Sequence, residues 1–412
     1  MTKKIALNAP AFPESKFLMK PFRILGLVLA LSASCGAPAV VRADSLASIF
    51  TNVTKSTAGQ PRRPSIIFIR CNGLGCGDLS CYGQTNYFTP NLDRLAANGM
   101  RFTGFHSGNA DFTGGLAALM TGKNAPFAPG SKTLAERLQA VGYYTGLIGE
   151  WTLGPKPWTQ GFNNFGGFIS EDEGRDYYAD HLWRFSPHSL FDPTNKVVSD
   201  YVGREMIYQN TGGRKGRWMP QTLMDGILNF TRDEQPDSFN RYRPIFLLAD
   251  LPAPRSAVRG ADDFPVPSDA PYSDSPWPQA AKNRAALITR IDGNIGRLME
   301  ELNLIELTNN VAIIFSSSAP PEKSSNTNLD FLKLNGDAPA EMDAAFTPLP
   351  MIIWWPRIVP AGRVSDVPWS NADIMPTLLE MVRGDKVPEL DGVSRARTLR
   401  GLSETNRMEA PH

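Results

Sequence analysis

Short apolar runs alternate with amphipathic segments along the chain from residue 65 onward. The runs are rich in β-branched and aromatic residues, which is typical of strands buried on both faces of a parallel sheet. They occupy residues 65–70, 143–148, 245–249, 311–315 and 351–355. Each run is therefore predicted to be a buried strand.

Helical patterns separate these predicted strands. Thr89 followed by Pro90 is typical of a helix start, and Thr133–Glu136 carries a capping-box pattern. Apolar residues at three- and four-residue steps over Ile288–Ile305 predict one long amphipathic helix. The predicted helices begin at 89 and 133 and cover 220–233, 288–305 and 372–382.

The alternation of strand and helix predicts an α/β fold, a three-layer sandwich with helices on both faces of a largely parallel sheet. Residues 155–215 and 252–278 are rich in Pro, Gly and polar residues with weak periodicity, so no helix or strand is predicted there. In such a sheet, ligands bind beyond the carboxyl ends of the strands. Any active site is expected among the residues that follow Ile69, Ile148, Ala249 and Phe315.

The first 43 residues carry the pattern of a secretory signal. Basic residues precede a short apolar run, Ile24–Leu31, and small residues lead to a V-x-A cleavage pattern that ends at Ala43. We expect a signal peptide over residues 1–43, with either Met1 or Met19 as its start.

The rest of the chain is expected to be exported, as a periplasmic or secreted protein without a membrane span. A polar linker follows the signal over residues 44–64. An uncleaved anchor is less favoured because the apolar run is short for a bilayer. A lipoprotein attached at Cys35 is also less favoured, because Ser32 occupies the position where Leu is usual.

The charge of the chain argues against nucleic acid as a partner. Its 412 residues contain 42 Lys and Arg and 41 Asp and Glu, and phosphate neutralisation needs clustered excess base. Residues 1–43 hold six of the basic and one of the acidic residues, so that cleavage would leave 36 against 40. A hydrophobic content of 42% excludes a disordered chain.

Three cysteines remain after the expected cleavage, Cys71, Cys76 and Cys81. In an oxidising compartment, an odd number suggests one disulfide and one thiol, with the pairing left open. Their five-residue spacing matches no zinc pattern, and the whole chain has only four histidines.

Ordered motifs extend from the first predicted strand to about residue 395. They include Gly75–Gly83, Thr89–Thr103, Ala117–Gly122, Thr133–Leu138 and Gly146–Gly149. Together they resemble the sulfatases, the formylglycine-dependent family with the alkaline-phosphatase-like fold. The resemblance implies one sulfatase-like domain over residues 65–400 and a polar tail over 401–412. It also implies that the smaller C-terminal subdomain of active sulfatases is truncated or missing.

The catalytic positions that the resemblance implies are all substituted. A sulfatase converts the Cys of a C-x-P-S-R motif to formylglycine, whose hydrate attacks sulfur, while Lys, Arg and His neutralise charge and move protons. Phenylalanine at the first of these positions cannot supply a nucleophile. The residues found are Phe112 for the cysteine, Leu116 for the arginine, Glu150 for the lysine, and Thr152, Arg255 and Asn371 for histidines.

The cation-binding positions are substituted as well. Asn72 and Gly73 stand where two adjacent aspartates are usual, and Ser318 and Ala319 where Asp and Asn are usual. The family default is calcium, which takes about six or more oxygen ligands. One neutral amide, that of Asn72, cannot recruit such an ion, so no cofactor is expected.

These substitutions predict a catalytically inactive pseudoenzyme with a binding or scaffolding role outside the cytoplasm. A sulfated or other glycan, or another exported protein, is the expected partner. The alternative is a hydrolase that acts on sulfate or phosphate esters by a non-standard mechanism. Its candidate pocket residues are Cys71, Asn72, Cys76, Asp78, His106, Asp111 and Glu150.

Some of these residues also have a simpler interpretation. Asp78 lies in a Gly-rich turn, where an aspartate caps backbone N–H groups. His106 is interpreted as a packing residue. Cys71 and Cys76 fill space or form a local bond rather than act as nucleophiles.

Overall fold

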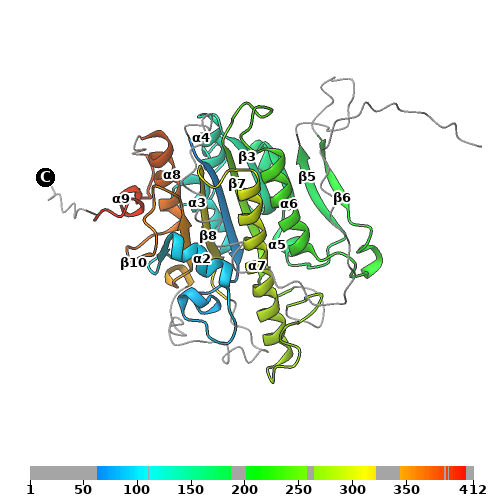
Figure 1. Ribbon diagram of the computed structural model, residues 1–412. Coiled ribbons are helices and arrows are strands. Elements are labelled where there is room, and N and C mark those ends of the chain that lie inside the picture. The colour runs from blue at the N-terminus through cyan, green and yellow to red at the C-terminus, as the bar shows by residue number, and fades with distance from the viewer. Residues whose placement is uncertain are drawn as a thin grey trace, which may run out of the picture. The chain divides into compact units, whose positions relative to one another are not determined.

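The predicted buried strands form the centre of a mixed sheet, which has ten strands within the part of the chain described here (Figure 1). The computed structural model describes residues 63–109, 111–186, 201–257, 264–321, 344–384, 387 and 389–404. The strands are β1 (Ser65–Asn72), β2 (Met100–Phe102), β3 (Tyr144–Glu150), β4 (Asn164–Phe168), β5 (His181–Ser186), β6 (Tyr201–Met206), β7 (Ile245–Pro254), β8 (Val311–Ala319), β9 (Met351–Trp354) and β10 (Arg363–Ser365).

The strand order is β10-β2-β9-β8-β1-β7-β3-β4-β5-β6. The five strands β8, β1, β7, β3 and β4 are parallel, whereas β9 on one side and β5 with β6 on the other run antiparallel to their neighbours. The expectation of a largely parallel centre is confirmed. The carboxyl ends of the central strands therefore meet at one edge of the sheet.

Helices cover both faces of the sheet, as predicted for a three-layer sandwich. Helices α2 (Pro90–Asn98), α6 (Met219–Asp233) and α7 (Gln279–Leu304) pack on one face, where Ile67 and Ile69 of β1 point. Helices α3 (Phe112–Thr121), α4 (Leu134–Gln139), α8 (Ile374–Arg383) and α9 (Ala396–Leu399) pack on the other, against Ile66 and Phe68. The short helix α5 (Glu171–Gly174) follows β4.

The absence of regular structure predicted for residues 155–215 is wrong, because β4, α5, β5 and β6 lie there. Two glycines in β4 weaken its strand signal. Strand β5 has no continuous apolar run, because only Leu182 and Phe185 among its residues are buried. In the other such segment, 252–278, residues 264–278 form no helix or strand, as expected, but β7 extends into its start as far as Pro254.

Helix α3 was also absent from the sequence prediction. Gly114 and Gly115 near its start lower helix propensity. The second glycine leaves room for a neighbouring side chain, because a Cβ atom there would lie 2.8 Å from the Oγ of Ser107. Local propensity is thus overridden by a close contact with another segment.

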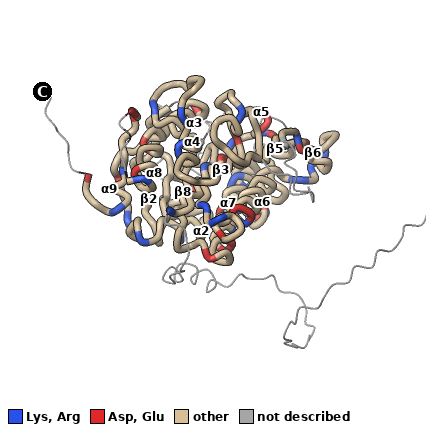
Figure 2. The backbone as a smooth tube through the Cα atoms, turned by 90° about the horizontal axis from the view of Figure 1, so that it is seen from above, with Lys and Arg blue, Asp and Glu red and all other residues tan. Residues whose placement is uncertain are grey.

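The expected signal peptide, Cys35, and nearly all of the linker fall outside the described residues, as do residues 405–412 of the tail. Within the described residues, no helix is long and apolar enough to cross a membrane. Lys and Arg are interspersed with Asp and Glu over this part of the chain (Figure 2).

The expected disulfide is wrong for the described cysteines, since no disulfide joins Cys71, Cys76 or Cys81. Cys71 is buried inside β1, whereas Cys76 and Cys81 belong to two separate 3-10 turns. Burial raises the pKa of the Cys81 thiol to about 12, with the neighbouring Asp93 adding to the shift. A thiol held in this protonated state is a poor nucleophile.

Candidate functional site at the strand ends

Four of the positions singled out in the sequence meet at the carboxyl edge of the sheet. Asn72 ends β1, Glu150 ends β3, and Arg255 directly follows β7. Ala319 ends β8 and lies opposite Asn72 in the register of the two strands. The parallel topology therefore brings together residues that are up to 247 positions apart in the chain.

An internal ion pair occupies this edge. Arg255 Nη2 donates to Glu150 Oε1 at 2.7 Å, and Arg255 Nη1 donates to Glu171 Oε2 at 3.3 Å. The Asn72 amide donates to the other oxygen of Glu150 at 3.5 Å. Glu150 is 0% exposed and Arg255 is 5% exposed. The Glu150 carboxyl is thus committed to protein partners on both of its oxygens.

Burial controls the ionisation of this group. Desolvation raises the pKa of Glu150 to about 8; Arg255 opposes the shift, and the carboxylates of Asp250 and Glu171 add to it. The dominant physical cause is the cost of placing a charge away from water.

A second buried ion pair lies within the central strands, before their carboxyl ends. Arg70 of β1 and Asp250 of β7 are register partners, and Arg70 Nη1 lies 3.6 Å from Asp250 Oδ2. Both side chains are fully buried, and neither charged group has a hydrogen-bond partner among the described residues. Burial raises the pKa of Asp250 to about 6, against the effect of Arg70.

The Phe112 side chain lies between the two pairs. Its ring centroid is 5.8 Å from the guanidinium carbon of Arg70 and 5.9 Å from that of Arg255, and the side chain is 5% exposed. Phe112 is the first residue of α3, and the preceding Asp111 accepts a hydrogen bond from Gly114 N at 2.6 Å. Asp111 therefore caps the helix that positions the ring.

The remaining substituted positions are packed against protein. Leu116 is fully buried in the apolar core, and the hydroxyls of Thr152 and Thr113 lie 2.9 Å apart. The Asn371 amide donates to the backbone oxygen of Ser107 at 3.1 Å.

The other candidate pocket residues contact different neighbours. Asp78 accepts from Gly75 N at 2.8 Å and pairs with buried Arg284 at 2.6 Å. The His106 ring lies 5.8 Å from that of Phe346. Cys71 is buried within β1, and Cys76 Sγ lies 3.8 Å from the backbone oxygen of Pro348. Apart from an electrostatic influence of Asp250 on Cys71, these contacts are separate from the Glu150 pair.

Sequence reasoning missed Arg70, Asp250, Glu171 and Arg284. The first two carry a signal, because a charge directly follows the apolar run of each central strand. Only the strand register shows that these charges face one another. Glu171 and Arg284 lie on helices whose approach to the strand ends has no sequence signature.

The donor set at the four cation positions is poor. Asn72 offers a neutral amide, and Ser318 a buried hydroxyl without a hydrogen-bond partner among the described residues. Gly73 and Ala319 have no polar side chain. No group of three or more His, Cys, Asp or Glu residues is arranged to hold a metal ion in the described parts of the chain.

The fold and the strand-end site define an α/β domain of the alkaline-phosphatase-like type. A family model described as Sulfatase matches residues 64–384, so the chain belongs to the sulfatase family. The N-acetylgalactosamine-6-O-sulfatase of Bacteroides thetaiotaomicron is 27% identical over 86% of this chain and 80% of its own length. The human arylsulfatase A is 28% identical over 84% of this chain and 69% of its own length.

Solved structures share the fold. A sulfatase from a Pseudoalteromonas species superposes with a TM-score of 0.63 at 21% identity, over 88% of this chain and 76% of that one. The phosphonate monoester hydrolase of Agrobacterium radiobacter gives a TM-score of 0.54 at 19% identity, over 84% and 78%. The expected sulfatase-like sandwich is thereby confirmed.

Proposed function

We propose that this sulfatase-family chain is an exported protein that does not hydrolyse sulfate esters and acts by binding. The observation that carries the proposal is the packing of Phe112 against the guanidinium groups of Arg70 and Arg255. A phenyl ring has no nucleophilic atom, and here it occupies the start of the helix where the resemblance implies formylglycine.

Charge at the site supports the same conclusion. A sulfate ester is an anion, and Glu150 and Glu171 contribute carboxyl groups beside the position it would occupy. The guanidinium of Arg255 is already bonded to both. The guanidinium that would stabilise a developing anion in a transition state is thus already engaged by two carboxyl groups of the protein.

The donor set does not fit the calcium ion that the family implies. Calcium requires about six or more oxygen ligands, with carboxylates among them. The four positions supply one amide and one hydroxyl, while the backbone of Arg255 lies against Gly73. We infer that no step of this protein's action uses a cation at this place.

A binding role fits a chain that keeps the sulfatase fold while its catalytic positions are substituted. The relatives are named for sulfated N-acetylgalactosamine, so a sulfated or other glycan is the first partner to test, and another exported protein the second. The signal-peptide pattern of residues 1–43 supports export.

The alternative is a hydrolase with a different mechanism, for which Glu150 is the best acid because its raised pKa keeps a proton at neutral pH. Its complete burial disfavours this role.

The deciding experiment is hydrolysis of 4-nitrophenyl sulfate and 4-nitrophenyl phosphate by the purified mature chain. We expect no turnover above a heat-inactivated sample. Turnover that is lost in the Glu150→Gln variant would overturn the proposal and favour the alternative. Turnover that is equal in the two proteins and elutes with the chain on gel filtration would also overturn the proposal, whereas turnover that elutes separately comes from a contaminant and leaves the expected result standing.

A further inference from the structure

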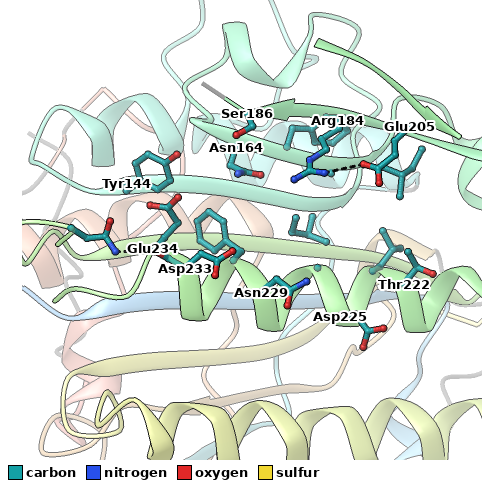
Figure 3. Close-up of a pocket in the computed structure, with 18 of the residues that line it drawn as sticks. Tyr144, Asn164, Arg184, Ser186, Glu205, Thr222, Asp225, Asn229, Asp233 and Glu234 are labelled. Carbon is teal, nitrogen blue, oxygen red and sulfur yellow. Dashed lines mark hydrogen bonds and ion pairs between the residues drawn. The ribbon is translucent and has the colours of Figure 1, made fainter. Parts of the chain in front are cut away.

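A groove of about 760 Å³ lies between α6 and strands β3, β4 and β5 (Figure 3). This volume falls within the range of roughly 300–1,000 Å³ that is typical of small-molecule sites. Its lining contains none of Asn72, Phe112, Glu150 and Arg255. The groove is therefore separate from the strand-end site, on the face of the sheet that α6 covers.

Two glycines keep the groove open. Gly226 of α6 and Gly166 of β4 both line it, and Ile148 of β3 lies between them. A Cβ atom at Gly226 would meet only Ile148, at 3.5 Å, which is an ordinary contact distance. Neither glycine has a positive φ angle. Because neither the backbone conformation nor crowding requires glycine at position 226, the missing side chain has its main effect on the space in the groove.

The charges of the groove are balanced within it. Four arginines and four carboxylates line its walls. Ion pairs join Arg184 to Glu205 at 3.1 Å, Arg217 to Asp225 at 2.9 Å and Arg243 to Glu234 at 3.5 Å. An anionic ligand would be repelled by the carboxylates and would find arginines that are already paired. A cationic ligand would be repelled by the arginines and would find carboxylates that are already paired. The lining favours a ligand that is uncharged and polar.

Hydrogen-bonding groups project into the groove from both walls, as Figure 3 shows for Asn164 of β4 and Asn229 of α6. Neither amide makes a hydrogen bond to another described residue. Each amide offers both donors and an acceptor. Such pairs suit hydroxyl groups, which also donate and accept.

An exposed aromatic ring completes the groove. Phe239 lines it and is 89% exposed, the largest exposure among the large hydrophobic side chains described. The loop that presents the ring is fixed, because Asn240 donates to the backbone oxygens of Asp233 and Gln235, both at 2.9 Å. Arg241 and Tyr242 follow with φ angles of 55° and 54°, a strained conformation for residues with side chains.

We propose that this groove binds a neutral saccharide, with a sugar ring packed on Phe239 and its hydroxyls bonded to the amides and ion-paired carboxylates of the walls. One face of a sugar ring is lined by C–H groups and packs on an aromatic ring, while its edge carries hydroxyls. The groove offers these two surfaces together and no unbalanced charge. The inference does not depend on whether the strand-end site is catalytic.

The test is an array of unsulfated and sulfated oligosaccharides probed with the mature chain, followed by calorimetric titration of the best unsulfated binder. We expect binding that is unchanged between low and high salt, since a neutral ligand is not subject to screening. Gly226→Leu should place a side chain in the groove and weaken binding at least tenfold. Gly293→Leu is the matched control, because Gly293 lies inside α7 with nothing within 4 Å of its Cβ position.

A second pair of variants does not depend on the fold tolerating a new side chain. Phe239→Ala should weaken binding, whereas Phe88→Ala, at a ring that is 67% exposed outside the groove, should leave it unchanged. Failure of every unsulfated glycan to bind would overturn the proposal. So would equal binding by Gly226→Leu and Gly293→Leu, or binding of sulfated glycans alone. None of these outcomes bears on sulfate-ester hydrolysis, which is measured separately.

Discussion

The wild-type chain should become less stable as pH rises, and replacing Glu150 with Gln should remove this loss of stability. Burial holds the pKa of Glu150 at about 8 in the folded chain, against an ordinary value of 4.5. The folded protein therefore retains a proton that the unfolded chain releases. Because the raised pKa belongs to an acid, the free energy of unfolding falls as pH rises from about 4.5 to about 8.

The size of the effect follows from these two values. Between about pH 6.5 and pH 8.5, a carboxyl with a folded pKa of about 8 lowers the free energy of unfolding by about 2 kcal/mol. Burial also raises the pKa values of Asp250 and Asp292, in each case to about 6. Those two groups complete most of their titration below this window and are present in both proteins.

The assay is urea unfolding followed by tryptophan fluorescence at three pH values across the window. The wild-type chain should lose about 2 kcal/mol more than Glu150→Gln. Glu300→Gln, on the exposed side of α7, is the control and should keep the wild-type slope. Equal slopes for wild type and Glu150→Gln would refute the reasoning that burial, rather than Arg255, dominates the ionisation of this group.

Three further outcomes are expected. Asp111→Ala should lower the free energy of unfolding by about 1 kcal/mol, because Gly114 N loses its cap, and Asp111→Asn should restore most of it in thermal melts. Arg255→Met, measured above the folded pKa of about 8 so that Glu150 is ionised, should cost about 3–5 kcal/mol in the wild type, by leaving a buried carboxylate without its cation, but clearly less in the Glu150→Gln background. Millimolar calcium should leave the melting temperature unchanged. A specific ligand of the folded chain would raise the melting temperature by mass action, and we expect no calcium site. A rise that magnesium does not reproduce would contradict the loss of the site.

The centre of the fold could be predicted because its strands are buried on both faces. Residues 65–70 and 311–315 read as continuous apolar runs, and their positions in β1 and β8 agree with the structure. Strands β5 and β6 could not be found in the same way. They lie at the end of the sheet, and charges such as Arg184 and Glu205 interrupt their apolar residues, so neither strand forms an apolar run.

For the candidate site, the sequence predicts which strand ends lie close together but not which side chains pair. The rule that strand ends converge brought Asn72, Glu150 and Arg255 together correctly. It did not show that Glu150 and Arg255 pair with each other, since that depends on side-chain direction at the end of β3 and after β7. Nor did it show that Asp78 is separate from the Glu150 pair and bonds instead to Arg284 of α7.

The substitutions at the strand ends form one exchange rather than independent losses. The resemblance implies Lys at position 150 and His at position 255, and the chain carries a carboxylate and a guanidinium there instead. Either change alone would bury a charge beside an unsuitable neighbour, at a cost of about 3–5 kcal/mol. Made together, they place Glu150 Oε1 2.7 Å from Arg255 Nη2. The aromatic ring of Phe112 then lies against the same guanidinium. Restoring a cysteine at 112 would still leave Glu150 and Arg255 bonded to each other beside it, so we expect that no single reversal gives hydrolysis of sulfate esters.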